Sequence, residues 1–377
     1  MTEKKIARKY IENTESDEIG GTLLLILGGQ GSGKTSGLWN MAGIDFNQDR
    51  IVFYRGQRSC SWIGLCANGL PVTLWMHESI EDYTFKVRGD KRKGIPEKEI
   101  DIENKEDVDV KVRRFSGPDE LVEKAEVDRI NVHYIPGEKW EDKKEFYFFL
   151  DQEKKFAEAL NTRSWGNPVS KYDDEFGNVG TEDDSYPYHR LIKYGIPNEY
   201  ADFRKNGVKQ VSAGHDTSEI HYKFYKVKFN RIMYMKGAKV DSGLDPEIDQ
   251  SKVNEYDAGE FILAEGRYNK DHFEEPTYPE DAIDWIPEQQ SRRLQMEIEA
   301  DIPDVVDEKD KKQQELEDSL IKRSDLDEFI GTREAADILG CSNSNLRNLI
   351  RKGQVPAIKV NNRHILSIEQ VLDKAEN

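Results

Sequence analysis

The chain has few cysteines, no long apolar run and no excess of positive charge. Its three cysteines, Cys60, Cys66 and Cys341, have no Cys-x-x-Cys spacing, which argues against a disulfide framework and a cysteine metal site and indicates reduced thiols. The apolar run Leu23–Leu27 is far too short to span a bilayer, so we expect a cytoplasmic protein without a membrane segment. With 55 basic and 73 acidic residues among 377, the formal net charge is −18. Any contact with nucleic acid must therefore be confined to a local patch or to a channel assembled from several subunits.

A glycine-rich segment at residues 28–35 fits the phosphate-binding pattern G-x-x-x-x-G-K-[ST]. An apolar run that predicts a strand precedes it, and helix-forming residues follow from position 35 to 41. In such a segment the backbone N–H groups converge on the phosphates of ATP, Lys34 reaches the β- and γ-phosphates, and the Thr35 hydroxyl ligates Mg²⁺. The residues predicted to bind the nucleotide are Gly28, Gly29, Gln30, Gly31, Ser32, Gly33, Lys34, Thr35 and Ser36.

Predicted strands alternate with predicted helices after this loop. Strands are expected at 51–54, 71–77, 129–135, 209–213 and 230–235, with a short helix around 220–227. Apolar residues from Phe146 to Leu160 recur at the spacing of one helical face. This order predicts an α/β fold of the P-loop NTPase type, with a mostly parallel sheet covered by helices on both faces.

Changes in composition divide the chain into four parts. We expect an N-terminal leader at 1–19, an ATPase domain at 20–287, a charged linker at 288–326 and a small domain at 327–377. Within the ATPase domain, residues from about 88 to 128 are dense in charge and predict an insertion. The stretch from 241 to about 287 is rich in acids, prolines and aromatics and predicts an irregular segment laid over the core.

Hydrolysis at a phosphate loop usually needs an acidic element near the end of a neighbouring strand. Two segments qualify, residues 146–153 and residues 169–175, and we favour the second because the first lies within the helical periodicity. There Asp174 is the predicted Mg²⁺ ligand and Glu175 the predicted catalytic acid. Ser170 and Lys171 are unusual for a buried parallel strand, so the alternative is a solvated acidic turn. Glu153 is the next candidate for the catalytic acid.

Three polar residues further along could sense the γ-phosphate from the tip of a core strand: Gln210, Ser212 or His215. Arg204 is the predicted arginine finger, a residue that reaches the nucleotide of a neighbouring subunit and stabilises charge in the transition state. The alternatives are a surface arginine for Arg204 and a hydrogen-bonded loop histidine for His215.

The order of these elements over residues 20–240 resembles the FtsK/HerA superfamily of DNA-pumping ATPases, especially those of viral packaging and plasmid transfer. The loop at 28–35, the acids at 173–175 and the strand at 211–213 with the residues after it carry the resemblance. It implies a homo-oligomeric ring that hydrolyses ATP and moves double-stranded DNA through its centre, with arginine fingers acting between subunits.

The C-terminal part shows a second pattern. A capped helix at 332–340 ends at a glycine, Ser342 caps another helix, and two short strands around residues 361–363 form a predicted wing. This order resembles the excisionase or MerR-like winged helix-turn-helix family. Residues 341–367 carry no acid, and the predicted DNA-binding residues are Asn343, Asn345 and Arg347 at base edges and Arg351, Lys352, Lys359 and Arg363 at phosphates. The alternative is a protein-docking module.

Together these patterns predict an ATP-hydrolysing DNA translocase or packaging motor with a DNA-recognition domain. An ATP-switched partition or regulatory protein is the alternative, although the residues at 29–31 lack the extra lysine that partition ATPases usually carry there. A small-molecule kinase is a third possibility, but it would have no evident use for the C-terminal domain.

Overall fold

The protein is described from a computed structural model. The structure describes residues 21–89, 96–103, 108–137, 142–181, 188, 190–225, 229–264, 271–272, 294–302, 329–351, 355, 357–360, 363–367 and 371. The chain divides into two compact units, residues 1–306 and 307–377, each of which is considered by itself. The predicted leader at 1–19 lies outside the described residues.

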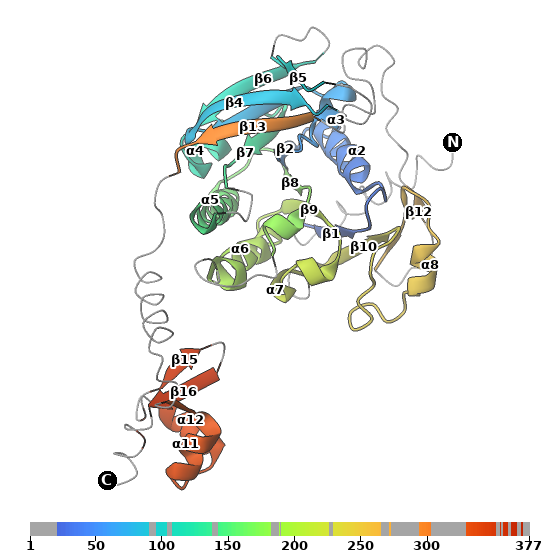
Figure 1. The fold of residues 1–377 in the computed structure, drawn as a ribbon. Coiled ribbons are helices and arrows are strands. Elements are labelled where there is room, and N and C mark those ends of the chain that lie inside the picture. The colour runs from blue at the N-terminus through green and yellow to red at the C-terminus, as the bar shows by residue number, and fades with distance from the viewer. Residues whose placement is uncertain are drawn as a thin grey trace. The chain divides into compact units, whose positions relative to one another are not determined.

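A ten-stranded sheet forms the centre of the first unit, in the order β12-β11-β10-β1-β9-β8-β2-β7-β3-β6 (Figure 1). The strands from β10 to β6 are parallel, and β11 and β12 are antiparallel. This arrangement confirms the predicted α/β fold with a mostly parallel sheet. The strands are β1 Leu23–Leu27, β2 Ile51–Arg55, β3 Val72–His77, β6 Val110–Phe115, β7 Ile130–Tyr134, β8 Val169–Asp173, β9 Val208–Gly214, β10 Arg231–Met235, β11 Glu260–Leu263 and β12 Asp271–His272.

Helices cover both faces of this sheet. On β1, Leu24 and Ile26 belong to the apolar cluster that includes helix α2, whereas Leu23, Leu25 and Leu27 belong to the cluster that includes helices α5 and α6. Successive side chains of a strand point to opposite faces, so β1 is buried on both sides, as the continuous apolar run predicted. The helices are α2 Lys34–Asn47, α3 Ile63–Ala67, α4 Pro118–Glu123, α5 Lys143–Thr162, α6 Ile196–Phe203, α7 Tyr222–Tyr225 and α8 Gln250–Asn254.

The predicted insertion at 88–128 is wrong in part, because β6 belongs to the central sheet and pairs with β3. The predicted linker at 288–326 also contains a strand, β13 Leu294–Ala300, which pairs with β4 Ile80–Val87; β5 Lys98–Ile100 completes this antiparallel sheet. Both β6 and β13 mix apolar with charged residues because they are exposed on one side. Because of their many charged residues, the sequence did not predict these two segments as strands. The irregular segment expected at 241–287 likewise includes α8, β11 and β12.

The second unit contains two helices and a three-stranded antiparallel sheet in the order β14-β16-β15. Its elements are β14 Phe329–Gly331, α11 Thr332–Ile338, α12 Asn343–Arg351, β15 Ile358–Val360 and β16 Arg363–Ser367. The buried side chains of Ala335, Leu346 and Leu366 form part of a separate core. The N–H of Asn345 donates to the Ser342 hydroxyl at 3.1 Å, so Ser342 caps α12 as predicted. Among the described residues, no helix is long and apolar enough to cross a membrane.

Candidate functional site

The glycine-rich loop joins the carboxyl end of β1 to the first turn of α2. Gly31 and Gly33 have φ values of 77° and 96°, a left-handed conformation that residues with a side chain rarely adopt. A Cβ atom added at Gly28 would lie 2.5 Å from the Ser32 hydroxyl oxygen. The glycines at these positions therefore allow the tight curl that turns backbone N–H groups toward a phosphate at the helix N-terminus.

The segments that follow β10 and precede β11 hold the loop by backbone hydrogen bonds. The N–H of Gly29 donates to the carbonyl of Lys236, just after β10, at 2.8 Å. The N–H of Gly259, just before β11, donates to the carbonyl of Ser32, also at 2.8 Å. The loop is thus fixed by contacts with segments more than 200 residues away in the chain, which local sequence could not reveal.

Lys34 lies over the loop. Its ammonium group donates to the carbonyls of Gly28 at 2.6 Å and Gly29 at 3.0 Å, and it lies 3.5 Å from Nδ1 of His215. Burial lowers the pKa of Lys34 from its ordinary value of 10.5, while the negative charges of Asp174, Glu175 and Glu219 oppose that shift. The lysine is therefore a partly desolvated cation facing several acids, an arrangement suited to phosphate oxygens.

The Thr35 hydroxyl donates to a carboxylate oxygen of Asp174 at 3.0 Å. Asp174 directly follows β8 and is 5% exposed. Because β9 lies between β1 and β8, the loop strand and the acid strand are separated by two strand spacings, or about 10 Å. The acidic segment therefore faces the phosphate loop across the tip of β9. A hydroxyl and a carboxylate are the ligands that Mg²⁺ uses beside a nucleotide, so these two residues fit such an ion.

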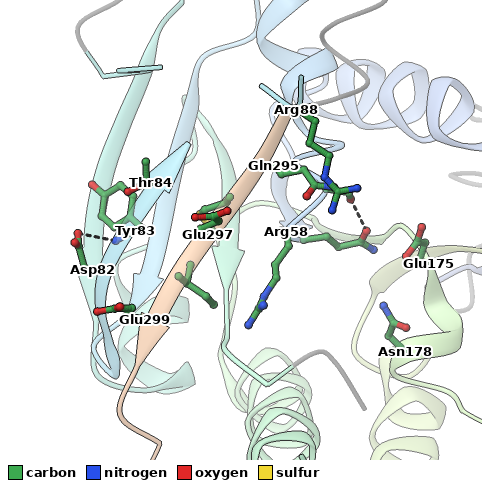
Figure 2. A pocket seen from close by; sticks show the side chains of 14 residues that line it. Arg58, Asp82, Tyr83, Thr84, Arg88, Glu175, Asn178, Gln295, Glu297 and Glu299 are labelled. Carbon is green, nitrogen blue, oxygen red and sulfur yellow. Dashed lines mark hydrogen bonds between the residues drawn. The ribbon is translucent and has the colours of Figure 1, made fainter. Parts of the chain in front are cut away.

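Glu175 follows Asp174 and has a φ of 52°, one of three non-glycine residues in the described chain with positive φ. Its side chain is exposed. A pocket of about 920 Å³ opens beside it and is also lined by Gln57, Arg58 and Asn178 and by residues of β4 and β13 (Figure 2). Glu175 is thus the acid of this segment that water reaches directly.

The strand before these acids is the one preferred from the sequence. β8 occupies Val169–Asp173, and the competing segment at 146–153 lies on α5, as the helical periodicity predicted. The polar residues of β8 are buried because they have partners. Lys171 donates to both carboxylate oxygens of Asp173, at 2.7 and 2.6 Å, and to the Tyr200 hydroxyl at 3.2 Å.

Glu153 is part of the same buried cluster. Its carboxylate lies 3.4 Å from the Lys171 ammonium and 3.3 Å from Nε2 of His133. Burial would raise the pKa of Glu153, but the charge of Lys171 and the contact with His133 together hold it below its ordinary value of 4.5. With 1% exposure, Glu153 is a buried ion-pair partner on α5 and is not placed to meet a nucleotide.

The predicted γ-phosphate sensors lie in different places. Gln210 and Ser212 are buried within β9, where the Gln210 amide donates to Asp173 and to the Ser212 hydroxyl, each at 2.8 Å. His215 alone of the three lies past the end of β9, beside Lys34. Arg204 is at the opposite edge of the sheet, where its carbonyl accepts from the N–H of Gly21, just before β1. It therefore cannot reach the loop of its own chain, and its role toward a neighbouring subunit stays a prediction.

Sequence reasoning missed Arg55, at the end of β2, and Gln57. Arg55 is 1% exposed and donates to the side chain of Asp173 and to the carbonyls of Asp174 and Glu175. The only signal was a polar triplet ending an apolar strand, which usually indicates a surface turn.

In the second unit, the side chains of Asn345 and Arg347 are exposed on α12. Asn343 and Arg351 belong to the same helix, Lys359 to β15 and Arg363 to β16. Lys352 lies outside the described residues. The two helices and the β15–β16 hairpin lie where the sequence predicts them, and β14 was not predicted. DNA binding by these residues stays a prediction.

No protein-family profile and no curated protein sequence matches the chain. Solved structures resemble it in fold. The genome-packaging NTPase B204 from Sulfolobus turreted icosahedral virus 2 shares 9% identity over 64% of this chain and 91% of its own, with a TM-score of 0.36. The DNA-packaging ATPase B204 from Sulfolobus turreted icosahedral virus shares 12% over 57% and 91%, with a TM-score of 0.23. The bacterial conjugative coupling protein TrwB shares 10% over 72% and 92%, with a TM-score of 0.44. Similarities this low establish neither family membership nor function.

Proposed function

We propose that the first unit binds ATP with Mg²⁺ and hydrolyses it. The observation that carries this proposal is the hydrogen bond between Thr35, at the start of α2, and Asp174, at the end of β8. It brings the phosphate loop and an acid from a distant part of the chain to one point at the carboxyl edge of the sheet, where ligands of open α/β sheets bind.

The residues of the loop have distinct roles in this proposal. The N–H groups of residues 28–36 surround the phosphates, and Lys34 exchanges its bonds with the carbonyls of Gly28 and Gly29 for bonds with phosphate oxygens. Thr35 and Asp174 would hold Mg²⁺, which neutralises charge on the phosphates. Glu175, exposed beside the pocket of Figure 2, orients the attacking water and accepts its proton. His215 contacts the γ-phosphate from the tip of β9.

We further propose that hydrolysis drives movement of double-stranded DNA and that the chain works as a homo-oligomeric ring. Two features support a DNA substrate. The order of phosphate loop, acid pair and β9 resembles the FtsK/HerA ATPases, and a basic segment without acids follows at 341–367 on a chain of net charge −18. In this proposal Asn343, Asn345 and Arg347 contact bases, and Arg351, Lys352, Lys359 and Arg363 contact phosphates. Arg204 serves the nucleotide of a neighbouring subunit.

The test is ATP hydrolysis by the full chain with and without duplex DNA, in wild type and in the Lys34→Ala and Glu175→Gln variants. A DNA motor has turnover that rises with DNA and is lost in both variants. Nucleotide affinity distinguishes why turnover is lost in the two variants. Lys34→Ala weakens nucleotide binding, whereas Glu175→Gln leaves binding intact and blocks the chemical step.

A matched control is Glu123→Gln, a similar change at an exposed site on α4, which leaves turnover unchanged. Full activity in Glu175→Gln would show that another acid acts on the water. If DNA did not change turnover, the proposal of a DNA motor would be contradicted, while the proposal of an ATPase would stand.

A further inference from the structure

The backbone of the acid pair is held from the neighbouring strand β2. The Arg55 guanidinium donates to the carbonyl of Asp174 at 2.6 Å, to the carbonyl of Glu175 at 3.1 Å and to the carboxylate of Asp173 at 3.3 Å. The Gln57 amide donates to the same Asp174 carbonyl. Arg55, at the end of β2, and Gln57, just after it, thus donate hydrogen bonds to three consecutive residues, 173–175.

One of these three residues, Glu175, has an unfavourable backbone conformation. Glu175 has a φ of 52° in a region that residues with a Cβ rarely occupy. Such conformations persist only where surrounding contacts over-determine them. The carbonyls that flank this conformation are the ones that Arg55 and Gln57 bind.

We propose that Arg55, assisted by Gln57, is the positioning residue of the proposed ATPase: it fixes the direction in which the Glu175 carboxylate points. The inference rests on the proposed function, since it concerns how Glu175 meets its water. Arg55 is 1% exposed and faces Asp173, which is fully buried. It therefore acts through the acidic segment and does not touch the nucleotide.

A lysine at position 55 cannot replace the arginine in this role. The guanidinium is a rigid planar fork that spreads its donors over several acceptors, whereas an ammonium group is a compact point charge on a flexible stem. Arg55→Lys keeps the buried positive charge beside Asp173 but releases at least one of the two carbonyls. Small displacements of a catalytic group lower the rate far more than they lower binding.

The test is a double-mutant cycle of Arg55→Lys and Glu175→Gln in the full chain, read by single-turnover ATP hydrolysis and by nucleotide affinity. We expect Arg55→Lys to reduce the hydrolysis rate by roughly 10- to 100-fold with nucleotide affinity within about twofold of wild type. In the Glu175→Gln background the same change reduces the residual rate by less than about twofold, because the group it positions is gone.

Two further variants separate positioning from stability. Arg129→Lys is the matched control, since Arg129 is also buried and also donates to carbonyls, those of Val72 and Asp109 at the opposite edge of the sheet. It lowers stability without a specific loss of hydrolysis. Gln57→Ala removes the second bond to the Asp174 carbonyl, together with the bond that Gln57 accepts from the Ser59 hydroxyl. It leaves Arg55 in place, so it should give a smaller rate loss of the same kind and can be measured even if Arg55→Lys folds poorly.

The inference is overturned if Arg55→Lys and Gln57→Ala turn over at the wild-type rate, or if Arg55→Lys slows the Glu175→Gln enzyme as much as it slows wild type. Those results leave the ATPase itself in place. Absence of hydrolysis by wild type instead overturns the proposed function, and wild-type turnover in Glu175→Gln transfers the catalytic role to another acid.

Discussion

Thr35 and Asp174 are 139 positions apart in the chain, and a hydrogen bond of 3.0 Å joins their side chains. The contact exists because parallel strands bring their carboxyl ends to one edge of the sheet. Removing the hydroxyl by Thr35→Ala is expected to weaken Mg²⁺-dependent nucleotide binding by roughly 10- to 100-fold. A Mg²⁺ titration of nucleotide binding measures this.

Thr35→Ser is the matched control, because it keeps the hydroxyl and loses only a methyl group. It should require nearly the wild-type Mg²⁺ concentration. An unchanged Mg²⁺ requirement in Thr35→Ala would show that the ion is held elsewhere.

The charge of Lys34 predicts how nucleotide affinity depends on pH. Phosphate binding needs the protonated form, and burial lowers the pKa of this lysine below 10.5. Affinity should therefore fall as pH rises, and the fall should begin below the range of an ordinary lysine. Because the Glu219 carboxylate raises the pKa of Lys34, Glu219→Gln should move the fall to lower pH.

Nucleotide affinity measured from neutral pH up to 10.5 checks this prediction. The matched control is Glu123→Gln, on α4, a carboxylate that does not act on Lys34. The same curve for Glu219→Gln and wild type would contradict the electrostatic link. The effect of the same pKa shift on stability has the opposite direction. Because the pKa of Lys34 is lower in the folded than in the unfolded chain, the free energy of unfolding rises as pH increases from the folded-state pKa to the unfolded-state pKa.

Much of the fold was predictable because short stretches of consecutive residues determine it. The run before the loop, the glycines and the helix after it occupy consecutive residues, and the face from Phe146 to Leu160 repeats within one helix. The strands β6 and β13 were not predictable in this way, since their charged residues face outward and only pairing with β3 and β4 defines them.

For the candidate site, the residues that follow the pattern were predictable and those that support them were not. Asp174 and Glu175 follow a strand, which the sequence could suggest. Lys171 and Arg55 are charged residues that the sequence would place at the surface, and they are buried only because Asp173 and the neighbouring carbonyls pair with them. The partners of Arg55 lie at the end of β8 and just after it, 118 to 120 positions away in the chain. Asp173 lies only two positions from Lys171, on the same strand.

Another buried ion pair involves Asp45 on α2. Its carboxylate lies 2.8 Å from the Lys209 ammonium and accepts from the Tyr172 hydroxyl at 2.5 Å. Asp45→Ala would leave Lys209, whose side chain is 8% exposed, without this partner. We expect a loss of about 3–5 kcal/mol in the free energy of unfolding, measured by urea denaturation.

The matched control for Asp45 is Asp202→Ala, which breaks a pair with Lys205 whose side chains are 44% and 76% exposed. Solvent screens that pair, so the urea midpoint should hardly move. Equal midpoints for the two variants would show that burial of Asp45 does not set its contribution.

The three cysteines should differ in reactivity. Cys60 and Cys66 are buried, and burial raises the pKa of Cys60 to about 12 and that of Cys66 still further. The thiolate is the reactive form, so neither should react with a thiol reagent at neutral pH. Cys341 is only partly buried. In the native protein one thiol should react rapidly, and Cys341→Ser should abolish that reaction. Denaturant should make the other two thiols reactive. Rapid labelling of Cys60 in the native protein would contradict its burial.

The exposed Arg347 on α12 tests the second unit. Each cation that contacts a phosphate releases counterions, and a cation at a base edge adds sequence preference. Arg347→Ala in the full chain should therefore weaken duplex binding and relax its preference for one sequence by roughly 1–3 kcal/mol. Fluorescence anisotropy with specific and scrambled duplexes at several salt concentrations measures both effects.

Lys124→Ala provides the control for Arg347. Lys124 directly follows α4 in the first unit, and 57% of its side chain is exposed. The substitution removes the same charge from the chain as Arg347→Ala does. It should leave both affinity and preference as they are. If the two variants weakened binding alike, the effect would be one of net charge, and α12 would not be the helix that reads DNA.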